Sequence, residues 1–146
     1  MAMNVNVKKL SPEARLPQYG TEFSAGADLY ALCPEPVTVA PGETVLIHTG
    51  LSLEIPQGYG GFLYARSGLA TKRGLAPANK VGVIDADYRG EVMVALYNQS
   101  SQMQTVENGE RIAQLVIAPF LKAEFTEAEH LEETLRGTGG FGSTGK

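Results

Sequence analysis

The sequence has a single cysteine, Cys33, among its 146 residues. One thiol cannot form an internal disulfide, so nothing suggests an oxidising compartment, and we expect Cys33 to be a small apolar filler. The apolar runs are far shorter than the roughly 20 residues of a membrane helix, and the N-terminus has no apolar signal region. We therefore expect an intracellular, cytoplasmic protein without a membrane partner, or a nuclear one in a eukaryote.

Basic residues are also scarce, since 12 Lys and Arg stand against 16 Asp and Glu and the net charge is −4. A general nucleic-acid binder needs a basic face, so we expect no nucleic-acid partner. The two histidines, His48 and His130, have no Cys or carboxylate at ligand spacing, and neither belongs to a triad-like pattern with Ser or Cys. A zinc site and a nucleophilic triad are therefore not indicated.

Glycine and proline are abundant instead, with 17 Gly and 8 Pro. This content disfavours long helices and favours a turn-rich β protein. Residues 43–55 predict two short strands around a turn, 90–98 predict a strand buried on both faces, and 111–117 predict a strand that Pro119 stops. Turn residues at short intervals between such strands favour an all-β, jelly-roll-like barrel or sandwich.

Only two segments have helical propensity, 67–73 and the Glu-rich 123–135. Propensity alone does not decide whether the second segment forms a surface helix. Residues 136–146 differ from the rest because five of these eleven residues are glycine. Since ordering glycine costs the most backbone entropy, we expect this segment to have no fixed shape alone. The predicted organisation is one β domain over 1–135 and a mobile, glycine-rich arm over 136–146.

The arm contains two phosphate-loop patterns, and neither has the context it requires. Residues 137–142 match G-x-G-x-x-G without a following helix, and 140–146 match G-x-x-x-x-G-K without a following Ser or Thr. What remains is a run of small residues whose amides, with the Ser143 and Thr144 hydroxyls, suit an anion. The alternative is a disordered tail.

Residues 82–91, GVIDADYRGE, join two apolar strands as a predicted hairpin and carry two carboxylates. Asp85 follows an apolar run, so it is a candidate for a partly desolvated general base toward a water. The alternative is a charged turn in which Asp85 and Asp87 act as Asx caps and Arg89 is a solvated partner.

Two further positions suit phosphate chemistry. In ARSGLA at 65–70, Arg66 and Ser67 precede a predicted helical turn, where a guanidinium, a hydroxyl and free amides would bind a phosphate. The alternative is that Ser67 is only an N-cap. Asp28 is a candidate for holding a metal-bound water or an arginine, or is simply a polar strand residue. With the base candidate, this set suits hydrolysis of a phosphate ester or anhydride by an activated water.

Five segments together carry a resemblance to a known family. They are AGADLYA at 25–31, ARSGLA at 65–70, GVIDADYRGEV at 82–92, GERIAQLV at 109–116 and RGTGGFGSTG at 136–145. In this order they resemble the five motifs of the homotrimeric dUTPases (deoxyuridine 5′-triphosphate nucleotidohydrolases). The resemblance implies a β jelly roll that trimerises around a threefold axis with three shared active sites. It also implies that 123–135 runs extended onto a neighbouring subunit and is not a helix.

The implied reaction is hydrolysis of dUTP to dUMP and pyrophosphate, which limits uracil incorporation into DNA and supplies dUMP for thymidylate synthesis. Asp85 matches the family's base, which orients the water that attacks the α-phosphorus. Tyr88 matches the residue that packs against deoxyribose and leaves no room for a 2′-hydroxyl. The implied cofactor is Mg²⁺, held mainly by the substrate phosphates, with Asp28 supporting it through water.

The remaining residues that match the family form three sets. The set that reads uracil is Asn79, Gly82, Val83, Ile84 and Met93. The set that binds phosphate is Arg66, Ser67, Gly68 and Gln114. The arm supplies Arg136, Ser143 and Thr144 as a clamp on the γ-phosphate, and Phe141 with Gly142 to close over uracil. An arm that orders only on substrate would exclude water and complete the site.

Two other functions stay open on the same fold. One is a dCTP deaminase or a bifunctional deaminase–dUTPase, which would release ammonia from dCTP. The glycine-rich final motif with Phe141 and the complete 82–91 segment favour the plain dUTPase. The other is a trimeric protein that binds a regulatory partner, and the intact chemistry at Asp85 and Arg136 speaks against it.

Overall fold

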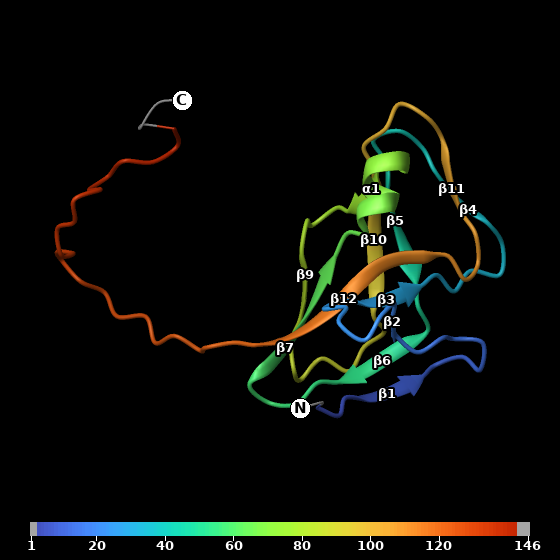
Figure 1. Ribbon diagram of the computed structural model, residues 1–146, viewed down its shortest axis with the longest axis horizontal. Coiled ribbons are helices and arrows are strands. Elements are labelled where there is room, and N and C mark those ends of the chain that lie inside the picture. Colours follow the sequence, from blue (N-terminus) through green and yellow to red (C-terminus); the bar gives the residue numbers. More distant parts are fainter. Residues whose placement is uncertain (1–2, 143–146) are drawn as a thin grey trace.

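The computed structural model describes residues 3–142, which form short antiparallel strands and one short helix (Figure 1). The strands are β1 (Asn6–Lys9), β2 (Gln18–Tyr19), β3 (Ala27–Tyr30), β4 (Val37–Val39), β5 (Thr44–His48), β6 (Leu51–Glu54), β7 (Tyr59–Tyr64), β8 (Leu75–Pro77), β9 (Gly82–Ile84), β10 (Met93–Asn98), β11 (Gln104–Val106) and β12 (Arg111–Pro119). The helix α1 spans Ser67–Arg73.

The strands form two larger sheets and two short ribbons. The largest sheet has the order β2-β3-β12-β7-β9, and a second sheet has the order β5-β10-β8. The pairs β1-β6 and β11-β4 complete the body, and all these pairings are antiparallel. The predicted all-β class is therefore confirmed.

The core lies between the two larger sheets and is almost wholly aliphatic. Its most buried side chains include Leu29 of β3, Ile47 of β5, Leu96 of β10 and Ile112 of β12. Cys33 is buried among them as a free thiol, as expected for an apolar filler. Burial of such side chains removes apolar surface from water and supplies the main stabilisation of the fold.

The strand predicted over 90–98 is shorter than expected and is buried on one face only. In β10 the side chains of Val94, Leu96 and Asn98 are buried, while those of Met93 and Ala95 are partly exposed. The prediction of burial on both faces is therefore wrong for this chain. The reason is that the second face of β10 lines a pocket and does not face another sheet.

The turn predicted within 43–55 lies between β5 and β6, and Gly50 makes it possible. Gly50 has a φ of 69°, a backbone conformation that favours glycine. A Cβ atom at this position would also lie 2.5 Å from Leu32 Cδ2 and 2.9 Å from Ala14 Cβ. The chain therefore needs glycine here on two grounds, and the predicted pair of strands is confirmed.

Of the two segments with helical propensity, only the first is a helix. Arg66 occupies the N-cap of α1 without a side-chain capping bond, so the interpretation of Ser67 as an N-cap is wrong. Residues 123–135 form neither helix nor strand and are exposed, and Figure 1 shows this segment leading away from the body of strands. A Glu-rich helix of this length is marginal without an apolar partner surface, which the segment lacks on its own chain. Within residues 3–142, no helix has the length and apolar character needed to cross a bilayer.

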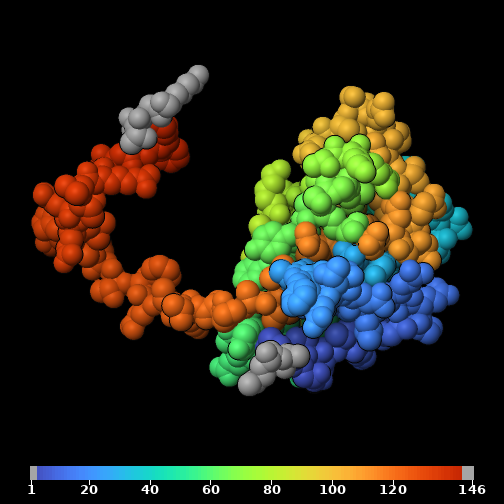
Figure 2. Space-filling model, in the orientation of Figure 1, coloured from blue at the N-terminus to red at the C-terminus, as the bar shows by residue number. Residues whose placement is uncertain are grey.

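Beyond β12 the chain leaves the body altogether. Figure 2 shows the C-terminal segment, in orange to red, arching away from the body of the molecule with open space between them. The side chains of Phe125 and Leu131 are 94% and 87% exposed along this segment. These apolar side chains therefore have no packing partner among residues 3–142.

One buried polar side chain yields a stability prediction. Asn98 is fully buried; its Nδ2 donates to the carbonyls of Val39 and Gln102 at 2.8 and 2.7 Å, and its Oδ1 accepts from the Ser100 amide and hydroxyl. Asn98→Ala leaves these buried groups unpaired, so we expect a loss of about 3 kcal/mol in the free energy of unfolding. Thermal and urea unfolding at one fixed protein concentration measure it. Gln99→Ala, at the exposed neighbour, is the control, and equal losses in both variants would contradict the assignment.

Candidate active site

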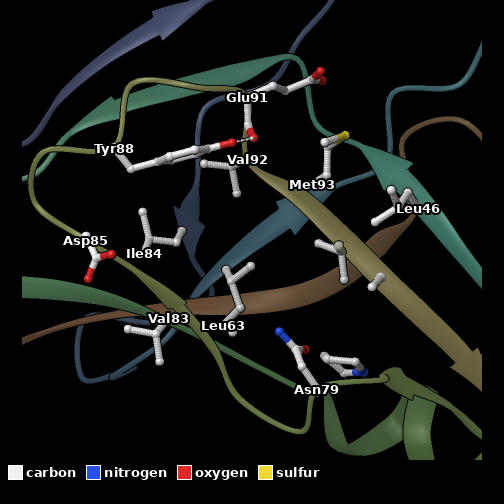
Figure 3. A pocket seen from close by; sticks show the side chains of 14 residues that line it. Leu46, Leu63, Asn79, Val83, Ile84, Asp85, Tyr88, Glu91, Val92 and Met93 are labelled. Atoms are coloured by element: carbon white, nitrogen blue, oxygen red, sulfur yellow. Dashed lines mark hydrogen bonds between the residues drawn. The ribbon is translucent and has the colours of Figure 1, made fainter.

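A pocket of about 300 Å³ opens where β9 and β10 diverge (Figure 3). The segment between them, residues 85–92, is called the β9–β10 loop from here on. β9 pairs with β7 in the larger sheet, whereas β10 pairs with β5 and β8 in the other sheet. The predicted hairpin over 82–91 is thus a loop that crosses from one sheet to the other. A crossing of this kind leaves a cleft between its two strands, and a closed hairpin would not.

The pocket brings together the base candidate and all residues expected to read uracil and deoxyribose. Those that line it are Asn79, Gly82, Val83, Ile84, Asp85, Tyr88 and Met93, joined by Leu46, Leu63, Pro77, Glu91, Val92, Val94 and Ala95. In Figure 3, Tyr88 and Glu91 lie at one end of the pocket and Asn79 at the other. Its volume falls at the lower end of the range for small-molecule sites.

The backbone of β9 is available to a ligand because β9 is the last strand of its sheet. Its pairing with β7 uses one edge, and the outer edge of an end strand presents unpaired N–H and C=O groups. Gly82 lets this backbone pack tightly, since a Cβ there would lie 3.1 Å from Leu63 Cβ and 3.4 Å from Asn79 Nδ2. The local structure thus presents backbone donors and acceptors together with the Asn79 amide.

Asp85 begins the β9–β10 loop and is exposed. Its carbonyl accepts from the Tyr88 amide at 3.1 Å and so closes a turn. Within the described residues neither Asp85 nor Asp87 makes a side-chain hydrogen bond, so the Asx-cap interpretation is wrong. The expected partial desolvation of Asp85 is likewise not met on a single chain. Its carboxylate is free to act on something outside its own chain.

Glu91 lines the same pocket, and the sequence analysis did not identify it. Its Oε2 lies 2.9 Å from His48 Nδ1, and its Oε1 accepts from the Gly50 amide at 2.9 Å. Burial by itself would raise the pKa of Glu91, but these hydrogen bonds and the charge of His48 lower it below its ordinary value of 4.5. Glu91 and His48 are 43 residues apart, so no local signal in the sequence links them.

A second pocket, of about 540 Å³, gathers every body residue expected to bind phosphate. The residues that line it are Gly20, Ser24, Ala25, Gly26, Asp28, Arg66, Ser67, Gly68, Arg111 and Gln114. Arg66 Nε donates to Asp28 Oδ1 at 2.7 Å, and Arg111 Nη1 donates to Asp28 Oδ2 at 3.4 Å. Two roles are predicted for Asp28, holding a metal-bound water or holding an arginine. The structure shows the second role, because Asp28 pairs with Arg66 and Arg111. The ion pair fixes a guanidinium at the pocket wall.

Arg111 is a pocket residue that the sequence analysis missed. In a regular strand Arg111 and Gln114 would face opposite sides, because side chains alternate with a period of two. The register of β12 against β3 shifts between Arg111 and Ala113, which is a β-bulge. The bulge brings Arg111 and Gln114 to the same pocket, and no pattern in the sequence indicates it.

Small residues shape the rest of this second pocket. Gln114 Nε2 donates to the Ala65 carbonyl at 2.8 Å, and its side chain lies against Gly26, where a Cβ would come within 3.1 Å of Gln114 Cδ. A Cβ on Gly68 would meet no atom within 4 Å. Packing within this chain therefore does not require glycine at 68, and the space beside it is open to a ligand.

No cluster of three or more His, Cys, Asp or Glu side chains suited to a metal ion occurs in residues 3–142. Mg²⁺ in phosphate sites is usually bound by one or two carboxylates together with substrate phosphates and water. Asp28, whose side chain is 14% exposed in the phosphate pocket, fits that limited role. The donor set is thus compatible with a metal carried mainly by a bound triphosphate.

The described arm residues, 136–142, line neither pocket. Arg136 Nε donates only to the Gly139 carbonyl, and Phe141 and Gly142 are exposed. Ser143 and Thr144 lie outside the described residues. The predicted site is therefore divided over three parts of the chain: the pocket beside β9, the phosphate pocket and the arm.

Several solved structures of phage dUTPases have this architecture. A mutant dUTPase of phage 80alpha superposes with a TM-score of 0.87 at 32% identity, covering 98% of this chain and 99% of that one. The Staphylococcus bacteriophage 80alpha dUTPase with dUPNHPP gives a TM-score of 0.85 at 32% identity, covering 99% and 100%. A mutant dUTPase of phage phi11 of S. aureus, described for coordination of a structural Mg(II) ion, gives 0.79 at 27% identity over 90% and 100% of the two chains. The jelly-roll-like fold is confirmed by this similarity.

Sequence comparison agrees with the structures. The deoxyuridine 5′-triphosphate nucleotidohydrolase of Desulfitobacterium hafniense is 55% identical over 132 residues, which cover 90% of this chain and 87% of the relative. The enzyme of the same name from Nautilia profundicola is 50% identical over 144 residues, covering 99% and 100%. The dUTPase family model matches residues 12–145. The chain therefore belongs to the dUTPase family of deoxyuridine 5′-triphosphate nucleotidohydrolases.

Proposed function

We propose that the chain hydrolyses dUTP to dUMP and pyrophosphate in active sites that are shared between copies of a homotrimer. The observation that carries the proposal is the division of the site. The pocket beside β9 and the phosphate pocket have no lining residue in common, and arm residues 136–142 line neither of them. One dUTP molecule must touch all three, so different copies of the chain would supply them.

The extended segment after β12 supports the same assembly. Leu121, Phe125, Leu131 and Leu135 are almost fully exposed on one chain. A soluble surface rarely carries so many large apolar side chains without a partner. Contact of this segment with a neighbouring subunit would bury them and would direct the following arm to a distant site.

Uracil is assigned to the pocket beside β9. The free edge of β9 offers backbone donors and acceptors, and Asn79 and Met93 line the same pocket. Uracil and cytosine differ on the edge that such groups read, because cytosine has a donor where uracil has an acceptor. A mismatched base would leave buried polar groups unpaired, which is a strong source of discrimination.

Deoxyribose is assigned to the Tyr88 ring at the same end of the pocket as Glu91. If the ring excludes a 2′-hydroxyl by contact, a smaller side chain should admit it. We expect Tyr88→Val to raise kcat/KM for UTP relative to dUTP by about tenfold or more. Tyr88→Phe keeps the ring and is the control, with a smaller change. A ratio that does not move in Tyr88→Val would mean that the sugar is recognised elsewhere.

The triphosphate is assigned to Arg66, Ser67, Gly68 and Gln114, with Arg136, Ser143 and Thr144 of an arm on its γ-phosphate. Asp28 orients Arg66 toward the phosphates through the 2.7 Å ion pair. Mg²⁺ bound to the phosphates, with Asp28 supporting it through water, would offset their charge. These local cations explain how a chain of net charge −4 accepts a triphosphate.

Asp85 is assigned as the general base. Its carboxylate accepts a proton from a water whose oxygen attacks the α-phosphorus in line. The new P–O bond replaces the bond to the bridging oxygen, and pyrophosphate leaves with the electron pair of that bond. Phe141 with Gly142 closes over uracil and excludes bulk water. In the cell this reaction would limit uracil incorporation into DNA and supply dUMP for thymidylate synthesis.

Product analysis with dUTP, dCTP, dTTP and UTP in the presence of Mg²⁺ tests the function. We expect dUMP and pyrophosphate from dUTP, and little turnover of the other three nucleotides. Ammonia released from dCTP would support a deaminase instead. Absence of turnover with all four nucleotides would favour a protein that only binds a partner.

A further inference from the structure

The Tyr88 ring is held by two contacts that belong to its own loop. Its hydroxyl donates to the Glu91 carbonyl at 2.9 Å (Figure 3). The ring also occupies the space above Gly90, where a Cβ would lie 2.5 Å from Tyr88 Cζ and 2.8 Å from Tyr88 Cε2. Position 90 must therefore lack a side chain for the ring to lie where it does.

The end of the loop that holds Tyr88 is itself fastened to the turn between β5 and β6. Both carboxylate oxygens of Glu91 are used, one on His48 Nδ1 and one on the Gly50 amide, each at 2.9 Å. Thr49 Oγ1 donates to the Val92 carbonyl at 2.5 Å. The Ser52 hydroxyl donates to the Arg89 carbonyl at 2.6 Å.

These contacts join two segments that are about forty residues apart in sequence, and all of them hold the loop just after Tyr88, at Arg89, Glu91 and Val92. The partners on the other segment, His48, Thr49, Gly50 and Ser52, do not line the pocket in which the nucleotide base is assigned. The Glu91 side chain is 23% exposed and His48 is 59% exposed, so the bond from the Gly50 amide, which is partly buried, is the better sheltered of the two and holds more firmly than a surface pair would. Free rotation of the loop end would let the Tyr88 ring move away from the sugar.

We propose that Glu91 is a positioning residue that sets the selectivity for deoxyribose over ribose. It ties the end of the β9–β10 loop to the β5–β6 turn, and the tie keeps the Tyr88 ring against the 2′ carbon of the sugar. The inference rests on the proposed function, because it assumes that Tyr88 meets the sugar of a bound dUTP. Gly90 contributes to the same selectivity, because the absence of a side chain there leaves room for the Tyr88 ring.

The test compares kcat/KM for dUTP with kcat/KM for UTP in four variants. Glu91→Ala removes the two hydrogen bonds of the Glu91 side chain, to His48 and to the Gly50 amide. Gly90→Ala displaces the Tyr88 ring and leaves the Glu91 side chain unchanged. In each, the preference for dUTP should fall by about tenfold or more. Glu91→Gln still accepts from the Gly50 amide and donates to a neutral His48, so most of the preference should return. Glu110→Ala is the matched control, since Glu110 is 31% exposed and ion-paired to Arg73 outside the pocket.

A preference that stays at the wild-type value in both Glu91→Ala and Gly90→Ala would overturn the inference. An equal fall in Glu110→Ala would also overturn it, because the effect would then reflect general loosening of the fold. A readout independent of activity separates this result from failure of the proposed function. In ¹³C-tyrosine-labelled protein, the Tyr88 ring signal, assigned with Tyr88→Phe, should move in Glu91→Ala and not in Glu110→Ala.

Discussion

Replacing Asp85 with asparagine is expected to lower kcat for dUTP by about three orders of magnitude and to leave nucleotide binding within a few-fold. The amide has the shape of the carboxylate but cannot accept a proton from the attacking water. The contacts assigned to uracil and phosphate do not involve the Asp85 side chain, so affinity should persist. Single-turnover rates together with equilibrium binding of a non-hydrolysable analogue measure the two effects separately.

Asp87→Asn is the matched control, because Asp87 is an exposed carboxylate in the same loop and does not line the pocket. Its kcat should remain close to that of the wild type. Near-wild-type activity in Asp85→Asn, or an equal loss in both variants, would mean that Asp85 is not the base.

Mixing two inactive chains is expected to restore about a quarter of the active sites. One chain carries Asp85→Asn with its arm intact, and the other ends at Gly137 with Asp85 intact. Each homotrimer should be nearly inactive, because every site lacks either the base or the arm. In a randomly mixed 1:1 trimer a site works when the truncated chain supplies Asp85 and the other chain supplies the arm.

Removal of the arm should not prevent assembly, because residues 138–142 are not part of the core. Co-refolding followed by a dUTP assay gives the result. As a control, the Asp85→Asn chain is mixed with a chain that carries both changes, and no activity should return. Well-mixed trimers without recovered activity would place Asp85 and the arm in the same subunit and contradict the shared site.

The sequence predicts the residues of the candidate site as separate sets, one for uracil and deoxyribose and one for phosphate. In the structure the members of each set line one pocket. Asn79, Asp85 and Tyr88 come from a short stretch of chain, and they line one pocket. Arg66 and Gln114 come from distant segments, but each belongs to a motif, and they line the other. Short motifs succeed here because a local loop or strand carries most of each set.

Features that depend on registers and distant pairs could not be predicted. The β-bulge after Arg111 decides that Arg111 faces the phosphate pocket, and no propensity indicates a bulge at that point. The tie between His48 and Glu91 depends on how β5 pairs with β10. The sequence wrongly predicts that β10 is buried on both faces. An apolar strand that lines a pocket on one face has the same composition as a strand between two sheets.

In residues 123–135 helix propensity predicts a structure that the chain does not form. Their Glu-rich composition favours a surface helix, yet the segment has no regular secondary structure. A helix needs an apolar face to bury, and in a shared assembly the apolar side chains of this segment would be buried by another copy. The conformation of such a segment depends on its partner, which the sequence of one chain does not display.

The most direct test of the central claim, attack of an Asp85-activated water on the α-phosphorus, is a single turnover of dUTP in ¹⁸O-labelled water. Mass spectrometry of both products then locates the label. One labelled oxygen is expected in dUMP and none in pyrophosphate, because the water forms its new bond to the phosphorus that stays with the nucleoside. Label in pyrophosphate, with dUMP unlabelled, would contradict it.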